Sequence, residues 1–143
     1  MAFSKRILDE AKGKTIAVAA DDMGLRLFDI KNLKAGNRPS MDMLIRLVHT
    51  GRYAPNYLLF NQGSRKLRTN VSVRGAQVRN IHQRLRNALR ARPAQELAAE
   101  SGLPIQSIYQ YRVDGRRPGL HIFLGLVLTG LSPNSLLLGR THR

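Results

Sequence analysis

The sequence contains an internal repeat, which restricts the possible folds because both copies have to adopt one structure. Gly24-Leu25 corresponds to Gly102-Leu103 at an offset of 78 residues, and Ile30 corresponds to Ile108 at the same offset. Further matches follow in the same order, with single-residue slips: Gly-Asn-Arg-Pro at 36–39 with Gly-Arg-Arg-Pro at 115–118, Thr-Gly at 50–51 with Thr-Gly at 129–130, and Pro-Asn at 55–56 with Pro-Asn at 133–134. We infer two copies of one module of about 55–60 residues.

Each copy has the pattern of several short helices. Ile81, Leu85 and Leu89 recur at the spacing of one helical face, Pro104 is placed to begin a helix, and Gly102 to end one. The predicted helices span 4–11, 15–22, 26–34, 41–50 and 56–60 in the first copy, and 79–90, 94–100, 104–112 and 120–128 in the second, where a loop is expected at 114–118 and a fifth helix from 132. The sequence therefore predicts an all-α protein.

Positive charge is concentrated between the two copies. The 143 residues include 24 Lys and Arg but only 9 Asp and Glu, which gives a formal net charge of +15. Nine of the basic residues and none of the acidic ones lie within 61–92. The first part of this stretch is rich in Gly, Ser, Thr and Asn, which is typical of a linker. We predict an N-terminal module at 1–60, a basic linker at 61–78 and a C-terminal module at 79–143.

Composition excludes several classes of protein. The chain has no Cys, so it cannot use disulfides or thiolate chemistry. Its longest nearly unbroken apolar run, 119–131, has 13 residues, fewer than the ~20 that a membrane helix needs. The first six residues lack the apolar core of a signal peptide. We expect a soluble cytoplasmic protein that does not enter a membrane, and the usual anionic partner of so basic a protein is nucleic acid.

No motif indicates catalysis, a metal or a cofactor. Gly13-Lys14-Thr15 ends like a phosphate-binding loop, but Leu8 stands where such a loop needs its first Gly. The four histidines are too scattered for metal-ligand spacing: His49, His82, His121 and His142. We expect a protein that is not an enzyme and holds neither a metal nor a cofactor.

One segment of the second copy resembles a known family closely. Residues 95–111 read Gln-Glu-Leu-Ala-Ala-Glu-Ser-Gly-Leu-Pro-Ile-Gln-Ser-Ile-Tyr-Gln-Tyr, which is similar to the helix-turn-helix of the Cro and lambda-repressor family. The likeness covers roughly 45–50 residues of the second copy, while the first copy fits more loosely through Ala19-Ala20 and Gly24-Leu25. The resemblance implies tandem lambda-repressor-like helix-turn-helix modules joined by the basic linker, with double-stranded DNA as the partner.

The same resemblance assigns residues that read bases. It places Ile105, Gln106, Ser107 and Gln110 toward the major groove. Gln can form a bidentate pair with adenine, and each good pair is worth about 1–3 kcal/mol of discrimination. Ile105 is expected to contact a thymine methyl group.

Basic residues around these positions are expected to bind phosphates, which fix register without reading sequence. In the second copy they are Arg79, Arg84, Arg86, Arg112, Arg116 and Arg117, and in the first copy Lys31, Lys34 and Arg38. The linker residues Arg65, Lys66, Arg68 and Arg74 are expected on phosphates or in an adjacent minor groove.

The first copy departs from the DNA-reading pattern. Its equivalent positions are Leu27, Phe28, Asp29 and Asn32, and a groove-facing Asp29 would be repelled by phosphates. Two interpretations stay open. Either this copy binds DNA with Phe28 against thymine methyl groups, or it has lost base readout and binds protein, with Leu27 and Phe28 in the interface.

The predicted helix 120–128 is almost wholly apolar, and such a helix is normally covered on all sides. Ile122, Phe123 and Leu126 are therefore candidates for an interface with a second chain, as in a homodimer on a palindromic site. Burial against the first copy within one chain is the alternative.

Together these features predict a sequence-specific DNA-binding transcriptional regulator, a repressor of the phage or mobile-element type. A first alternative is a module that sequesters another regulatory protein. A second is an accessory factor of recombination or conjugation that bends DNA. RNA binding is a weaker alternative, because the chain lacks the aromatic sheet motif of common RNA-binding modules.

Overall fold

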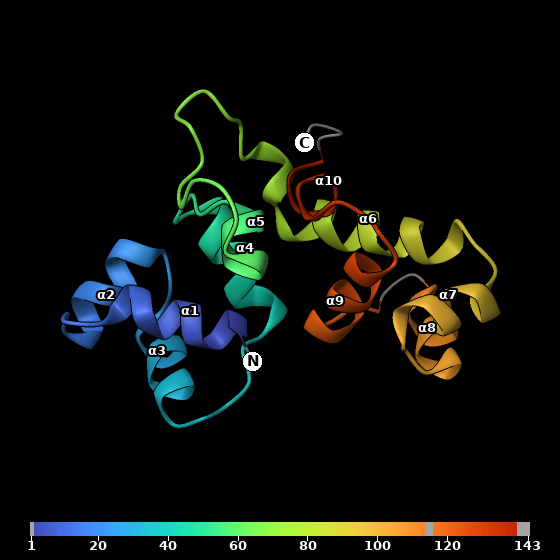
Figure 1. Ribbon diagram of the computed structural model, residues 1–143, viewed down its shortest axis with the longest axis horizontal. Helices are drawn as coiled ribbons and strands as arrows, with labels where there is room; N and C mark the ends of the chain where they lie inside the picture. The colour runs from blue at the N-terminus through green and yellow to red at the C-terminus, as the bar shows by residue number, and fades with distance from the viewer. Residues whose placement is uncertain (1, 114–115, 140–143) are drawn as a thin grey trace. The chain divides into compact units, whose positions relative to one another are not determined.

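A computed structural model describes residues 2–113 and 116–139, and all regular elements in these residues are helices (Figure 1). The protein is therefore all-α, as predicted. The chain divides into two compact units, Met1–Arg74 and Gly75–Arg143. Asp114 and Gly115, the first residues of the predicted loop, lie outside the described residues.

The first unit contains α1 to α5, which lie within a few residues of their predicted ends. They span Ala2–Ala11, Ile16–Met23, Leu27–Lys34, Met41–His49 and Pro55–Phe60. The first helix, α1, packs against α2, α3 and α5, and α2 packs against α3. The side chains that this packing buries fully include Ile7, Met23, Ile30, Leu47 and Leu58.

The second unit contains α6 to α10, preceded by the short 3-10 helix η1 (Arg74–Ala76). These helices span Val78–Arg90, Ala94–Ser101, Ile105–Tyr111, Leu120–Leu128 and Pro133–Leu138. Here α6 packs against α7, α8 and α10, so the first helix of each unit contacts the second, third and fifth. This agreement is what a duplicated module requires.

The short turn between the second and third helix explains one repeated glycine in each unit. Gly24 and Gly102 end α2 and α7 with φ of 72° and 74°, in the left-handed region that costs other residues strain. Gly24 has a second constraint, because a Cβ there would lie 2.8 Å from the Gly51 nitrogen and from Thr50 Cβ. The turn of the first unit is thus packed tightly onto the end of α4.

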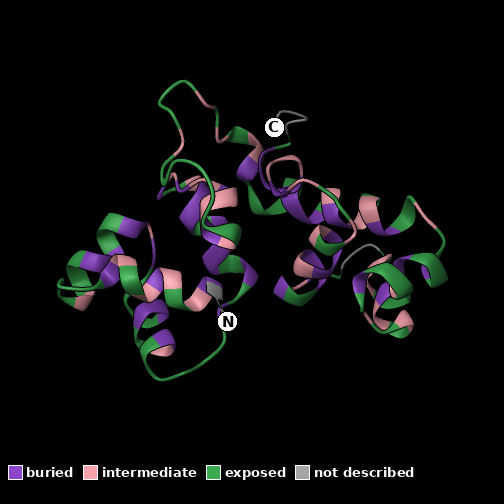
Figure 2. Ribbon diagram, viewed as in Figure 1, coloured by how far each residue is buried: buried purple, intermediate pink, exposed green. Residues whose placement is uncertain are grey.

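The apolar helix α9 is part of the core of its own unit, so the prediction that it forms an interface is wrong. Ile122, Phe123 and Leu126 are fully buried, because α9 packs against both α6 and α7. Burial is visible along α9 in Figure 2. Leu128, by contrast, is 73 % exposed at the end of the helix.

The predicted linker is not a separate segment. Residues 61–74, which we call the basic arm, belong to the first unit and fold back onto it. Lys66 forms an isolated antiparallel bridge with Tyr53, and the Arg52 guanidinium donates to the carbonyls of Arg68 and Val71 at 2.6 and 2.9 Å. These contacts could not be predicted from local sequence patterns, because they join residues distant in the chain. Most of the arm is nevertheless exposed (Figure 2).

Candidate nucleic-acid interface

Helix α8 presents a polar face to solvent. Ile108 is fully buried and anchors the helix, whereas Gln106 and Gln110 are exposed, as base-reading residues must be. Ile105 and Ser107 are only partly exposed and lie at the edges of this face. The structure therefore makes the two glutamines accessible and gives the other two predicted readers less accessible positions.

The turn before α8 holds the helix in place. The Leu103 amide donates to Ser101 Oγ at 3.1 Å. The Leu103 side chain packs so closely on α9 that a Cβ at Gly125 would lie 2.7 Å from it. The turn thus fixes α8 against α9. The side of α8 opposite buried Ile108 is left accessible to a ligand.

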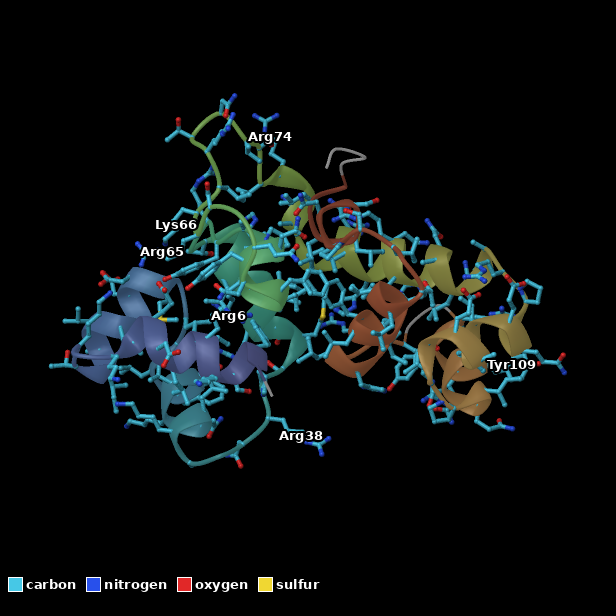
Figure 3. All side chains as sticks on the ribbon, viewed as in Figure 1. Arg6, Arg38, Arg65, Lys66, Arg74 and Tyr109 are labelled. Carbon is cyan, nitrogen blue, oxygen red and sulfur yellow. The ribbon has the colours of Figure 1, made fainter. Side chains whose placement is uncertain are left out.

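Tyr109 is a further exposed residue on this face that sequence analysis did not assign. It lies three residues after Gln106 and next to Gln110, and positions three or four apart share a helix face. Its side chain is 51 % exposed, at the rim of the unit in Figure 3. Its exposure follows from the burial of Ile108 on the other side of α8, which the structure shows. We call Gln106, Tyr109 and Gln110 the α8 face.

Two arginines predicted to bind phosphates hold the second unit together. Arg84 donates from Nε to the Leu136 carbonyl at 2.7 Å and from Nη2 to the Gly75 carbonyl. Its burial lowers the pKa of the guanidinium. Arg112 donates to the carbonyls of Leu89 and Arg92 at 2.8 and 2.6 Å. Both side chains are only partly exposed and point two nitrogens each at backbone carbonyls, so a phosphate contact from either one stays a prediction.

Arg86 is also engaged within the unit. Its guanidinium donates to the Arg116 carbonyl and to Gln83 Oε1, both at 3.0 Å, so it braces the loop rather than projecting from it. Arg79, Arg116 and Arg117 are exposed. Among the six arginines of the second unit that the sequence assigned to phosphates, these three are the exposed ones.

The third helix of the first unit has a different surface. Leu27 and Phe28 are 50 % and 49 % exposed, and the Arg26 guanidinium lies 4.3 Å from the Phe28 ring centroid. Such a cation over an aromatic ring is an attractive contact. This unit thus presents apolar side chains where the second unit presents glutamines.

Asp29 does not face a groove as the sequence suggested. It is 1 % exposed, and its carboxylate accepts from the Arg26 backbone N at 2.9 Å and from its guanidinium at 3.1 and 3.2 Å. The hydrogen bond to Asp29 raises the pKa of Arg26. Asp29 closes the first turn of α3 as a capping box, so its charge no longer argues against DNA binding.

The predicted phosphate-binding cations of the first unit are accessible. Lys31, Lys34 and Arg38 are all exposed. Arg38, labelled in Figure 3, also borders a shallow cleft that Lys5 lines from α1. An exposed cation beside a second one is suited to an anionic partner.

Glu10, on α1, holds the start of the basic arm in position through Arg65. Its carboxylate is mostly buried and accepts from Tyr53 Oη at 3.0 Å, Tyr57 Oη at 2.7 Å and Arg65 Nη1 at 3.0 Å. Desolvation and these bonds raise the pKa of both tyrosines. We call Glu10, Tyr53, Tyr57 and Arg65 the Glu10 cluster. Figure 3 labels Arg65 and the next residue, Lys66.

Lys66 is occupied as well. Its Nζ donates to the Gly51 carbonyl at 2.7 Å and lies 3.8 Å from the Tyr53 ring centroid, and burial lowers its pKa. Lys66 is nevertheless exposed, so its predicted phosphate contact stays a prediction. Arg65 forms an ion pair with Glu10. Arg68 and Arg74 are exposed and keep the role that the sequence predicts for them.

The described residues contain neither a candidate metal cluster nor a candidate membrane span. No group of three or more His, Asp or Glu side chains there could hold a metal ion; His142 lies outside them. Within residues 2–113 and 116–139, helices are too short or too polar to cross a membrane.

Comparison with known proteins finds nothing similar: no family model, no curated protein and no solved structure matches the chain. The helix-turn-helix assignment therefore stays a prediction that depends on residues 95–111.

Proposed function

We propose that the protein is a sequence-specific, double-stranded DNA-binding transcriptional regulator that reads the major groove with α8. The observation that carries this proposal is the α8 face, where Gln106 and Gln110 are exposed in a chain of net charge +15. A B-DNA major groove about 12 Å wide admits one helix. The two glutamine amides can each form a bidentate pair with adenine.

Exposed cations supply the part of the affinity that does not depend on sequence. Arg79, Arg116 and Arg117 belong to the same unit as α8, and phosphate contacts from such residues orient a protein on the duplex. The resemblance of 95–111 to the Cro and lambda-repressor family favours a repressor. A homodimer that uses α9 is not part of the proposal, because that helix is buried within its own unit.

Random-site selection with the full-length protein tests the proposal. We expect one enriched motif that contains adenine, bound more weakly as salt rises because counterions are released. The matched variant Gln106→Ala should lose about 1–3 kcal/mol of affinity for the motif and relax one base position. No enriched motif, or equal losses on the motif and on random DNA, would contradict base reading by α8.

A second candidate function is protein binding by the first unit. Half-exposed Leu27 and Phe28 favour it, since exposed apolar groups together often mark an interaction surface. In this case a Leu27→Ser/Phe28→Ser variant would keep the selected DNA motif and lose a protein partner recovered with the wild-type chain. Loss of the motif in this variant would count against the candidate.

A further inference from the structure

The exposure of Tyr109 is explained neither by packing in the core of the unit nor by the predicted base readers. Its ring is half-exposed on α8, although the same helix has a buried side for apolar groups, occupied by Ile108. It therefore contributes little to the core of the unit. An aromatic ring on the same face as two exposed glutamines is instead available to a ligand of the α8 face.

Arg112 restricts where this ring can lie. Its Cζ is 5.8 Å from the Tyr109 ring centroid, and its guanidinium is tied to the carbonyls of Leu89 and Arg92. Arg112 cannot follow the ring outward without breaking these bonds. A cation near an aromatic ring is an attractive contact, so the fixed guanidinium favours this position of the ring.

We propose that Tyr109 contacts the C5-methyl group of a thymine next to the bases that Gln106 and Gln110 read. This inference rests on the proposed function. Thymine is the only base that presents a methyl group in the major groove, and proteins distinguish it by apolar contact. The sequence assigned this contact to Ile105, which the structure leaves only partly exposed. Tyr109 offers the larger accessible apolar surface.

The experiment uses the site that the full-length protein selects. Each thymine in turn is replaced by deoxyuridine, which lacks only the methyl group, and the dissociation constant is measured for wild type, Tyr109→Ala and Tyr109→Phe. We expect one position where wild type loses roughly fourfold in affinity, the effect of removing one buried carbon group. Tyr109→Ala should lose nothing further there, and Tyr109→Phe should behave as wild type.

Three results would overturn the inference. The first is a site without any deoxyuridine-sensitive position, and the second is unchanged sensitivity in Tyr109→Ala. The third is a Tyr109→Phe variant that binds all these sites more weakly by one factor, which would indicate a phenol-to-phosphate contact. In each case wild type still binds its selected motif, so the proposed function survives. If wild type selects no motif, both fall. Circular dichroism of Tyr109→Ala controls for folding.

Discussion

Arginine side chains have two different roles in this protein, and hydrogen-bond partners separate them. Arg84 and Arg112 donate to backbone carbonyls of their own unit, whereas Arg79 and Arg117 are exposed. A buried carbonyl that loses its donor costs stability, while an exposed cation costs little to remove. Sequence alone placed all four on one phosphate-binding surface, because helical periodicity shows the face of a residue but not the carbonyls within its reach.

Arg84→Met tests this separation against the matched variant Arg79→Met. We expect Arg84→Met to lower the free energy of unfolding by about 2–3 kcal/mol, because it removes charged donors from two carbonyls. Arg79→Met should change it by less than about 0.5 kcal/mol. Urea unfolding followed by circular dichroism measures both. Equal stabilities would show that the Arg84 bonds do not support the fold.

The Glu10 cluster predicts a dependence of stability on high pH. Folding raises the pKa of Tyr53 and Tyr57 above the usual value of about 10. The folded state therefore holds these protons more tightly, and the stability they give is complete below about pH 10 and falls as pH rises above it. The lowered pKa of Lys66 acts in the opposite sense and offsets part of this loss.

Unfolding in urea between about pH 9 and 11, compared for wild type and a Tyr53→Phe/Tyr57→Phe variant, measures the effect. Wild type should lose stability more steeply than the variant, which has no phenols to titrate in the cluster. The near-ultraviolet absorbance of tyrosinate provides a control, since two tyrosines of wild type should ionise late. Parallel stability curves would show that the cluster does not bind its protons tightly.

At the scale of elements, the turns and the arm differ in how far the sequence reveals them. The glycines that end α2 and α7 could be predicted, because a left-handed C-cap is a local requirement. The fold of the basic arm could not, since Arg52 and Glu10 hold it from 16 or more residues away. Its Gly, Ser and Asn content is as typical of an ordered loop as of a flexible linker.

The two C-cap glycines should respond differently to alanine. At Gly102, where no atom lies within 4 Å of a new Cβ, only the left-handed backbone is unfavourable, which costs about 1–2 kcal/mol. Gly24→Ala adds a clash with the backbone of Gly51, so we expect a clearly larger loss of unfolding free energy. Urea denaturation measures the free energy of unfolding of both variants. A larger loss of this free energy in Gly102→Ala than in Gly24→Ala would contradict the packing of the α2–α3 turn.

The basic arm should open when its buried anchor is removed. The Glu10→Ala variant lacks the carboxylate that accepts hydrogen bonds from Arg65, Tyr53 and Tyr57. If this costs about 1.4 kcal/mol of local stability, tryptic cleavage at Arg65, Lys66 or Arg68 accelerates about tenfold. Asp9→Ala, at an exposed neighbouring position, is the control. Equal cleavage of the two variants would show that Glu10 does not hold the arm.

At the scale of the whole molecule, the repeat was the most informative feature of the sequence. It predicted one structure in two copies, while the helical spacing within each copy predicted the all-α class and the order of helices. The candidate site was predicted less completely: accessible Gln106 and Gln110 could be found from a motif, but Tyr109 required the burial pattern of α8. The apolar α9 was misassigned because hydropathy shows that a helix is covered without showing what covers it.

Salt dependence can show whether both units bind DNA. Each phosphate contact contributes about 0.9 to the slope of log affinity against log salt. Arg116→Ala/Arg117→Ala in the second unit and Lys31→Ala/Lys34→Ala in the first each remove two exposed cations. We expect each pair to reduce the slope by nearly two, because phosphate contact needs only an accessible charge. An Asn87→Ala variant, which changes no charge, is the control.

The two pairs also distinguish the candidate functions of the first unit. If its half-exposed Leu27 and Phe28 bind protein and the unit stays off the duplex, Lys31→Ala/Lys34→Ala leaves the slope unchanged while Arg116→Ala/Arg117→Ala still reduces it. Such a result would restrict the DNA interface to the second unit. A reduction by both pairs instead means that both copies of the repeat touch the phosphate backbone, even though only one carries glutamines that can read bases.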